Sequence, residues 1–111
     1  MAFPSYVVVT TTVADRETAE RIAGVLVNER LAGCVQVSGP VFSHYRWKGA
    51  SERTEEWRLD CKTTAARLSA LERRLLELHP YDLPEILALP VVQGSDAYLR
   101  WLDESTQGEG S

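Results

Sequence analysis

Between residues 57 and 62 the chain reads Trp57-Arg58-Leu59-Asp60-Cys61-Lys62, in which apolar and charged side chains alternate without interruption. Successive side chains of a β-strand point to opposite faces of a sheet, so this pattern predicts a strand with one buried face and one wet face. Strands of this kind are typical of antiparallel hairpins. The turn of the hairpin is predicted at Gly49-Ala50-Ser51, because glycine and small polar residues interrupt strands.

The first strand of this hairpin is predicted from Cys34 to Val41, and it continues in extended form from Phe42 to Lys48. Gly39-Pro40 lies within it, and we expect a bend or a bulge there because proline lacks the backbone donor that a strand ladder needs. The hairpin is therefore long for so short a chain.

One amphipathic helix is predicted on each side of the hairpin in the sequence. Asp15 can cap the first helix, and Gly33 is a suitable residue to end it. Thr63-Thr64 opens the second helix, and His79-Pro80 ends it, because the residue before a proline avoids the helical region. Each helix has one apolar face at helical spacing: Ala19, Ile22, Ala23, Leu26 and the stem of Arg30 in the first, and Leu68, Leu71, Leu75 and Leu78 in the second.

Two further strands and a last helix complete the pattern. The β-branched run from Tyr6 to Thr12 favours a strand, and so does the run from Glu85 to Leu89 between two prolines. Ser95 can cap a closing helix. The order β-α-β-β-α-β plus a C-terminal helix predicts an α+β, ferredoxin-like sandwich. We predict one domain over residues 1–105 and a flexible tail over 106–111, where the residues are small and polar.

Composition and charge exclude several classes of protein. Sixteen acidic against twelve basic residues give a formal charge of −4, which disfavours nucleic acid as a partner. RNA binding on the sheet is disfavoured as well, since the strand from Trp57 to Lys62 has one aromatic residue and mixed charges. No apolar run reaches the length of about 20 residues that spans a membrane. No signal peptide is visible at the start, so we expect the cytoplasm.

No catalytic motif stands out in the sequence. A GxSxG elbow, a P-loop and an HExxH motif are all missing from it. Cys34 and Cys61 are interpreted as packed core residues, because buried cysteines without an activating neighbour are inert. The adjacent carboxylates Glu55 and Glu56 are interpreted as solvated surface. We therefore predict a protein that is not an enzyme.

Four segments together resemble the CutA (divalent-cation tolerance) family, in that family's order and over nearly the whole chain. They are Leu31-Ala32-Gly33-Cys34-Val35, Tyr45-Arg46-Trp47-Lys48-Gly49, His79-Pro80-Tyr81-Asp82-Leu83-Pro84-Glu85-Ile86-Leu87-Ala88-Leu89-Pro90 and Gly94-Ser95-Asp96-Ala97-Tyr98-Leu99-Arg100-Trp101-Leu102. The resemblance implies a ferredoxin-like protomer and a homotrimer joined edge to edge through its sheets.

The residues give a separate reason to expect association between copies. A long hairpin carrying Tyr45, Trp47 and Trp57 leaves much apolar and aromatic strand edge for so small a domain. Exposed strand edges must be covered, blunted or paired, and threefold closure would pair them all.

The resemblance also implies copper or another divalent cation as a candidate ligand, with no obligatory cofactor. Members credited with copper binding resemble one another in a cysteine late in the first strand and two adjacent histidines before the proline. Here those positions are Thr11 and Leu78-His79, so His79 is the one candidate metal ligand. The alternative is that His79 is structural, since a histidine at the end of a helix favours the negative end of its dipole.

A small-ligand site is the other functional candidate. Trp47, Lys62, Tyr81 and Glu85, together with His79, lie at strand ends and in a loop, and edge-to-edge protomers would bring them to inter-subunit clefts. Such a set suits a small anionic or zwitterionic molecule. The alternative is that the aromatic residues are interface core and that Lys62 and Glu85 satisfy each other. We therefore predict a CutA-like trimer that is implicated in divalent-cation (copper) tolerance and binds a metal ion or a small ligand at its inter-subunit clefts. The alternative is a structural or partner-docking trimer without a metal site.

Overall fold

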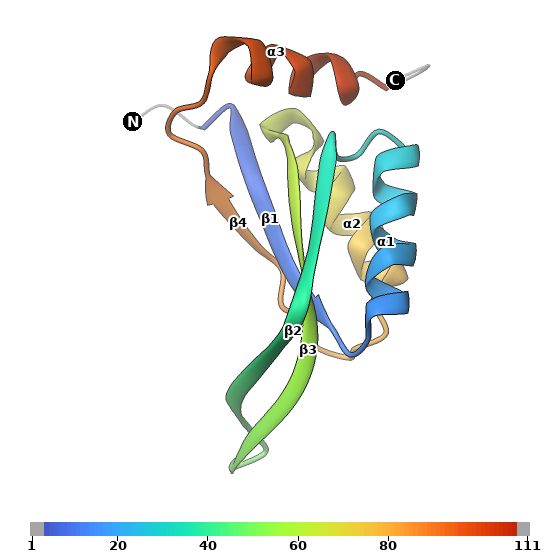
Figure 1. The fold of residues 1–111 in the computed structure, drawn as a ribbon, viewed down its shortest axis with the longest axis vertical. Helices are drawn as coiled ribbons and strands as arrows, with labels where there is room; N and C mark the ends of the chain where they lie inside the picture. The colour runs from blue at the N-terminus through green and yellow to red at the C-terminus, as the bar shows by residue number, and fades with distance from the viewer. Residues whose placement is uncertain (1–3, 109–111) are drawn as a thin grey trace.

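A four-stranded antiparallel sheet is the frame of the molecule, and the computed structural model describes residues 4–108 of the chain (Figure 1). The strands are β1 (Tyr6–Val13), β2 (Cys34–Trp47), β3 (Ala50–Thr64) and β4 (Leu87–Pro90), and they lie in the order β2-β3-β1-β4. The helices are α1 (Arg16–Asn28), α2 (Leu68–Leu78) and α3 (Asp96–Ser105), with a 3-10 turn, η1 (Ala65–Arg67), before α2. The predicted α+β class and the predicted order of elements are confirmed.

The core lies between the sheet and the pair of helices α1 and α2, which cover one face of the sheet (Figure 1). Leu59 and Cys61 are fully buried while Arg58 is exposed, so the alternation seen in the sequence is confirmed. The predicted apolar stripes of the helices are confirmed as well, since their central members are inaccessible to solvent: Ala19, Ile22 and Leu26 in α1, and Leu71 and Leu75 in α2. Burial raises the pKa of the Cys61 thiol to about 12, which agrees with an inert core role. Cys34 is only half-buried.

The β2–β3 hairpin extends well beyond the rest of the sheet (Figure 1). Residues 57–64 of β3 pair with β1, whereas within the described part of the chain the residues of β3 before Glu56 pair only with β2. We call residues 41–56 the hairpin arm. The predicted irregularity at Gly39-Pro40 is confirmed as a shift in register between Ser38 and Val41. Glycine is required at position 39 because a Cβ atom would lie 2.7 Å from the ring of Trp57.

Three element boundaries differ from those predicted. Helix α1 ends at Asn28 rather than near Gly33, and Arg30 has a φ of 60°, so its stem is not part of the apolar face of α1. The amides of Leu31 and Ala32 donate back to the carbonyl oxygen of Leu26, which closes the helix early with apolar residues. Strand β3 runs through Thr64, so Thr63-Thr64 does not open α2 directly. Strand β4 is shifted towards Pro90.

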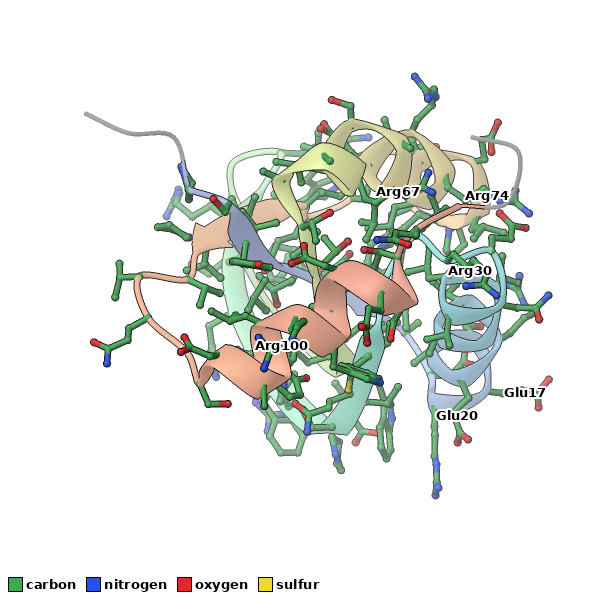
Figure 2. All side chains as sticks on the ribbon, turned by 90° about the horizontal axis from the view of Figure 1, so that it is seen from above. Glu17, Glu20, Arg30, Arg67, Arg74 and Arg100 are labelled. Carbon is green, nitrogen blue, oxygen red and sulfur yellow. The ribbon has the colours of Figure 1, made fainter. Side chains whose placement is uncertain are left out.

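Helix α3 lies across the end of the sheet, as the view from above shows (Figure 2). The ordered chain continues beyond it, because Thr106 is only 3% exposed and its hydroxyl donates to the carbonyl oxygen of Leu102. Arg67 donates to the carbonyl oxygen of Thr106 at 2.6 Å, which joins this end to the start of α2. Thr106 therefore caps α3 and does not belong to the predicted tail; residues 109–111 of that tail lie outside the described residues.

Candidate functional site

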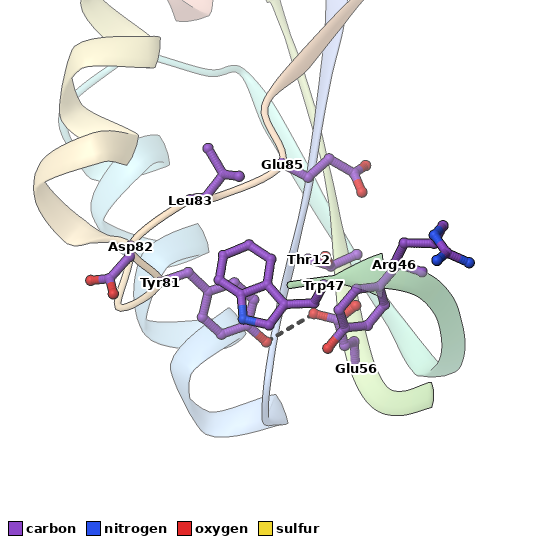
Figure 3. A pocket seen from close by; sticks show the side chains of 9 residues that line it. Thr12, Arg46, Trp47, Glu56, Tyr81, Asp82, Leu83 and Glu85 are labelled. Atoms are coloured by element: carbon purple, nitrogen blue, oxygen red, sulfur yellow. Dashed lines mark hydrogen bonds between the residues drawn. The ribbon is translucent and has the colours of Figure 1, made fainter. Parts of the chain in front are cut away.

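A pocket of about 420 Å³ lies where the hairpin arm meets the loop between α2 and β4 (Figure 3). Strand β1 contributes one residue to it, the hairpin contributes four, and the loop contributes four. The lining residues are Thr12, Tyr45, Arg46, Trp47, Glu56, Tyr81, Asp82, Leu83 and Glu85.

Strand alternation explains which side chains of the hairpin reach the pocket. Glu56 lies three residues before Leu59 on β3, so it points to the face of the sheet opposite the helices. Tyr45 and Trp47 are spaced two apart on β2 and therefore share one face. The loop enters from the other side, because Pro80 ends α2 and the chain must then turn towards β4.

Glu56 is the least expected residue of this site. The interpretation of Glu55 and Glu56 as solvated surface is correct for Glu55 but wrong for Glu56, which is only 7% exposed. The Tyr81 hydroxyl donates to Glu56 Oε2 at 2.8 Å (Figure 3). Burial, followed by this hydrogen bond, raises the pKa of Tyr81 above its usual range, so the phenol stays a donor. Across residues 4–108, no Lys, Arg or His forms a salt bridge with Glu56.

His79 lies directly behind the pocket and is 7% exposed. The Tyr81 amide donates to its Nδ1 at 3.2 Å, so the ring proton is on Nε2, which donates to the carbonyl oxygen of Thr12 at 2.9 Å. Nε2 also lies 3.1 Å from the hydroxyl oxygen of Thr11. Burial lowers the pKa of His79, which keeps the ring neutral. The ring packs against Tyr81 with a centroid distance of 4.8 Å and so holds that residue at the pocket wall.

A metal ion does not fit the residues of one protomer. Both ring nitrogens of His79 are engaged by the protein, and a metal would have to displace one of these hydrogen bonds. Within residues 4–108, no group of three or more His, Cys, Asp or Glu side chains is placed to hold a metal ion. Divalent metals such as copper and zinc need several nitrogen or sulfur ligands. The prediction that His79 is a metal ligand therefore has no support from the geometry of the single chain.

The pocket brings together some of the residues predicted for a ligand site. Trp47, Tyr81 and Glu85 all line it, and His79 supports Tyr81 from behind. Lys62 does not line it: in the sheet it lies opposite Val8 of β1 and Cys34 of β2, roughly 20 Å along β3 from Glu56 at about 3.3 Å per residue. Within residues 4–108 of a single protomer, Lys62 therefore lies outside this pocket and forms no salt bridge with Glu85. Its assignment to a cleft between copies stays a prediction.

Sequence reasoning missed Glu56 because nothing local marks it. By strand alternation Glu56 shares the charged face of Arg58 and Asp60. It is covered by the contact with Tyr81, which is 25 residues away in the sequence. Tyr45 and Asp82 did lie within segments that carry the family resemblance, so they could have been included on that ground.

The fold and the site thus define a class of protein. It is a small α+β domain that has a ligand-sized pocket at the base of a projecting hairpin. Within residues 4–108, no helix is long and apolar enough to cross a membrane. Residues 7–105 match the family model described as CutA1 divalent ion tolerance protein. The chain therefore belongs to the CutA1 family, as the resemblance of the four segments indicated.

Individual relatives agree with this assignment. The divalent-cation tolerance protein CutA of Thermus thermophilus is 46% identical over 99 residues, which are 89% of this chain and 96% of that protein. The chloroplastic protein CutA of Arabidopsis thaliana is 40% identical, and the match spans 91% of this chain but only 56% of the plant protein. The crystal structure of CutA from Xylella fastidiosa superposes with a TM-score of 0.90 at 41% identity, over 93% of this chain and 99% of that one.

Proposed function

We propose that this chain forms a homotrimer of ferredoxin-like protomers that binds a small ligand in the pocket beside the hairpin arm, and that this binding contributes to divalent-cation tolerance. In this proposal it is a binding protein rather than an enzyme, and it needs no obligatory cofactor. The observation that carries the proposal is the placement of a buried carboxylate, Glu56, in the wall of a ligand-sized pocket. The names of the relatives and of the family supply the link to cation tolerance. We keep the cytoplasm as the proposed location, although the name of the Arabidopsis relative places that protein in the chloroplast.

The strand edges support the trimeric assembly. β2 and β4 are the outer strands of the sheet, and within residues 4–108 each has one edge without a neighbouring strand. The strand order β2-β3-β1-β4, with the crossover helices on one face, supports the ferredoxin-like assignment. Large apolar side chains are exposed on both outer strands: Phe42, Tyr45 and Trp47 on β2, and Leu87 and Leu89 on β4. Closing three copies into a ring would pair every β2 edge with a β4 edge and cover those of these side chains that do not line the pocket, namely Phe42, Leu87 and Leu89.

Light scattering on a size-exclusion column tests the assembly. We expect a mass three times the 12.4 kDa of one chain at micromolar concentration. Titration calorimetry with a panel of metabolites then tests the pocket, and we expect saturable heat from at least one member. A trimer that gives no heat with any small molecule or metal would favour the structural, partner-docking alternative, and a monomer would contradict the assembly.

A copper-binding measurement distinguishes the small-ligand hypothesis from the hypothesis that His79 binds a metal ion. We expect Cu²⁺ to bind equally weakly to the wild-type protein and to the His79→Ala variant, because both ring nitrogens of His79 are already engaged. Equilibrium dialysis followed by metal analysis measures the bound copper per chain. Stoichiometric copper in the wild type that disappears in His79→Ala would restore His79 as a ligand and would require the ring to reorient.

A further inference from the structure

We propose that the pocket beside the hairpin arm recognises a small organic cation, an alkylated ammonium group that sits between aromatic rings and next to Glu56; this deepens the proposed function and rests on it. Three carboxylates and one guanidinium line the pocket, so its lining is net negative. The expectation of an anionic or zwitterionic ligand rested on a lysine, a histidine and a carboxylate meeting in one site, and Lys62 does not line this pocket. The charge of the pocket therefore favours a cation.

Glu56 is the carboxylate of the pocket that a bound cation would stabilise. As a residue Glu56 is only 7% exposed, and among residues 4–108 it accepts a single hydrogen bond, from the neutral phenol of Tyr81 to its Oε2. A buried carboxylate is costly unless a cation compensates it. Arg46 does not do so, because its guanidinium points away from Glu56 (Figure 3) and donates to the carbonyl oxygen of Gly49 at 3.4 Å. A bound cation would supply the compensation that the described chain lacks.

The aromatic residues that line the pocket favour one kind of cation over another. Tyr45, Trp47 and Tyr81 all contribute to this lining (Figure 3). The face of an aromatic ring attracts a cation, most strongly in tryptophan. Trp47 already attracts Lys48 of its own chain, whose Nζ lies 5.9 Å from the ring centroid. A metal ion prefers several close ligand atoms, whereas an alkylated ammonium group fits aromatic walls with one nearby carboxylate.

Three probes of the same shape and different charge test the inference with the full-length protein. They are choline, its neutral isostere 3,3-dimethylbutan-1-ol and the anionic 3,3-dimethylbutanoate. By titration calorimetry we expect choline to bind saturably and about tenfold or more tighter than the neutral alcohol, with no measurable binding of the anion. Equal affinity for choline and the alcohol would overturn the inference, because charge would then contribute nothing.

Two variants show whether Glu56 is responsible. We expect Glu56→Gln to weaken choline binding about tenfold or more, and Glu55→Gln, a matched change at the neighbouring exposed carboxylate, to leave it unchanged. Trp47→Leu provides a second variant at a half-exposed position, where folding is not at risk, and it should weaken choline several-fold. If Glu56→Gln changes the native mass but not the affinity for choline, then Glu56 compensates a cation of a neighbouring copy and the inference fails.

The probes also separate this inference from the function on which it rests. Tighter binding of 3,3-dimethylbutanoate than of choline would refute the cationic class of ligand and leave a small-ligand pocket in place. Absence of binding by all three probes, together with a metabolite panel that gives no heat, would remove both.

Discussion

Replacing His79 with alanine is expected to lower the free energy of unfolding by about 2–4 kcal/mol, the range for losing a buried side chain together with its hydrogen bonds. The ring links three parts of the molecule: it follows the last turn of α2, donates to the carbonyl oxygen of Thr12 in β1 and accepts from the amide of Tyr81. Alanine would leave that carbonyl and that amide without partners and would open a cavity beneath the pocket. Urea unfolding at a fixed protein concentration measures the loss.

The second histidine of the chain provides the control for this prediction. His44 is exposed on the hairpin arm, so His44→Ala should change the free energy of unfolding by no more than about 0.5 kcal/mol. If the two variants are equally stable, then the hydrogen bonds of His79 contribute nothing and the account of this residue is wrong.

The contribution of His79 to the free energy of unfolding is expected to depend on pH. Burial lowers the pKa of His79 in the folded protein relative to the unfolded chain, where it has its usual value near 6.5. The unfolded state therefore binds the proton more readily, and the contribution of His79 is complete above pH 6.5 and declines as the pH falls from there towards the folded pKa. We expect His79→Ala to remove this decline, whereas His44→Ala should retain it.

Replacing Leu89 with aspartate is expected to convert the proposed trimer into single chains. Leu89 lies opposite Val8 on the edge strand β4 and is 48% exposed in the isolated protomer, so assembly through this edge would cover it. A carboxylate at that position would have to be desolvated in the interface without a partner, which costs several kcal/mol in each of the three contacts. Light scattering should therefore report a threefold fall in mass.

Leu76 offers a matched control for the interface. It is 54% exposed on α2, away from both edge strands, so Leu76→Asp makes the same chemical change at similar exposure. We expect this variant to remain trimeric. Dissociation of both variants, or of neither, would show that β4 does not form the interface.

Local signals were sufficient to predict the frame of this fold. The alternation around Leu59 and the leucine stripe of α2 are set by periodicities that the sequence displays directly, and the structure buries Leu59 and the centre of that stripe, Leu71 and Leu75. The end of α1 was harder to predict, because the residues that close it, Leu31 and Ala32, fold back for tertiary reasons although Gly33 is the better stop by local propensity.

The site could be predicted only in part, for a physical reason. Trp47, Tyr81 and Glu85 carry residue types that suit a pocket and lie where strands end, and the structure brings them together. Glu56 could not be predicted, because a contact across 25 residues buries it. Lys62 does not reach the pocket of one protomer, because position along a long strand, rather than residue type, decides which side chains meet.

The hairpin arm has a mechanical consequence. Within residues 4–108 of a single copy, β2 and β3 continue from Glu56 towards the turn without a third strand beside them, and a two-stranded ribbon alone is only marginally stable in water. Contacts at the base of the hairpin arm, more than the core, therefore set the tilt of the arm relative to the sheet. This tilt in turn sets the distance from Trp47 to the loop at Tyr81. A ligand bound between Trp47 and this loop would restrict the motion of the hairpin arm. Ligand binding should therefore slow amide hydrogen exchange along residues 41–56.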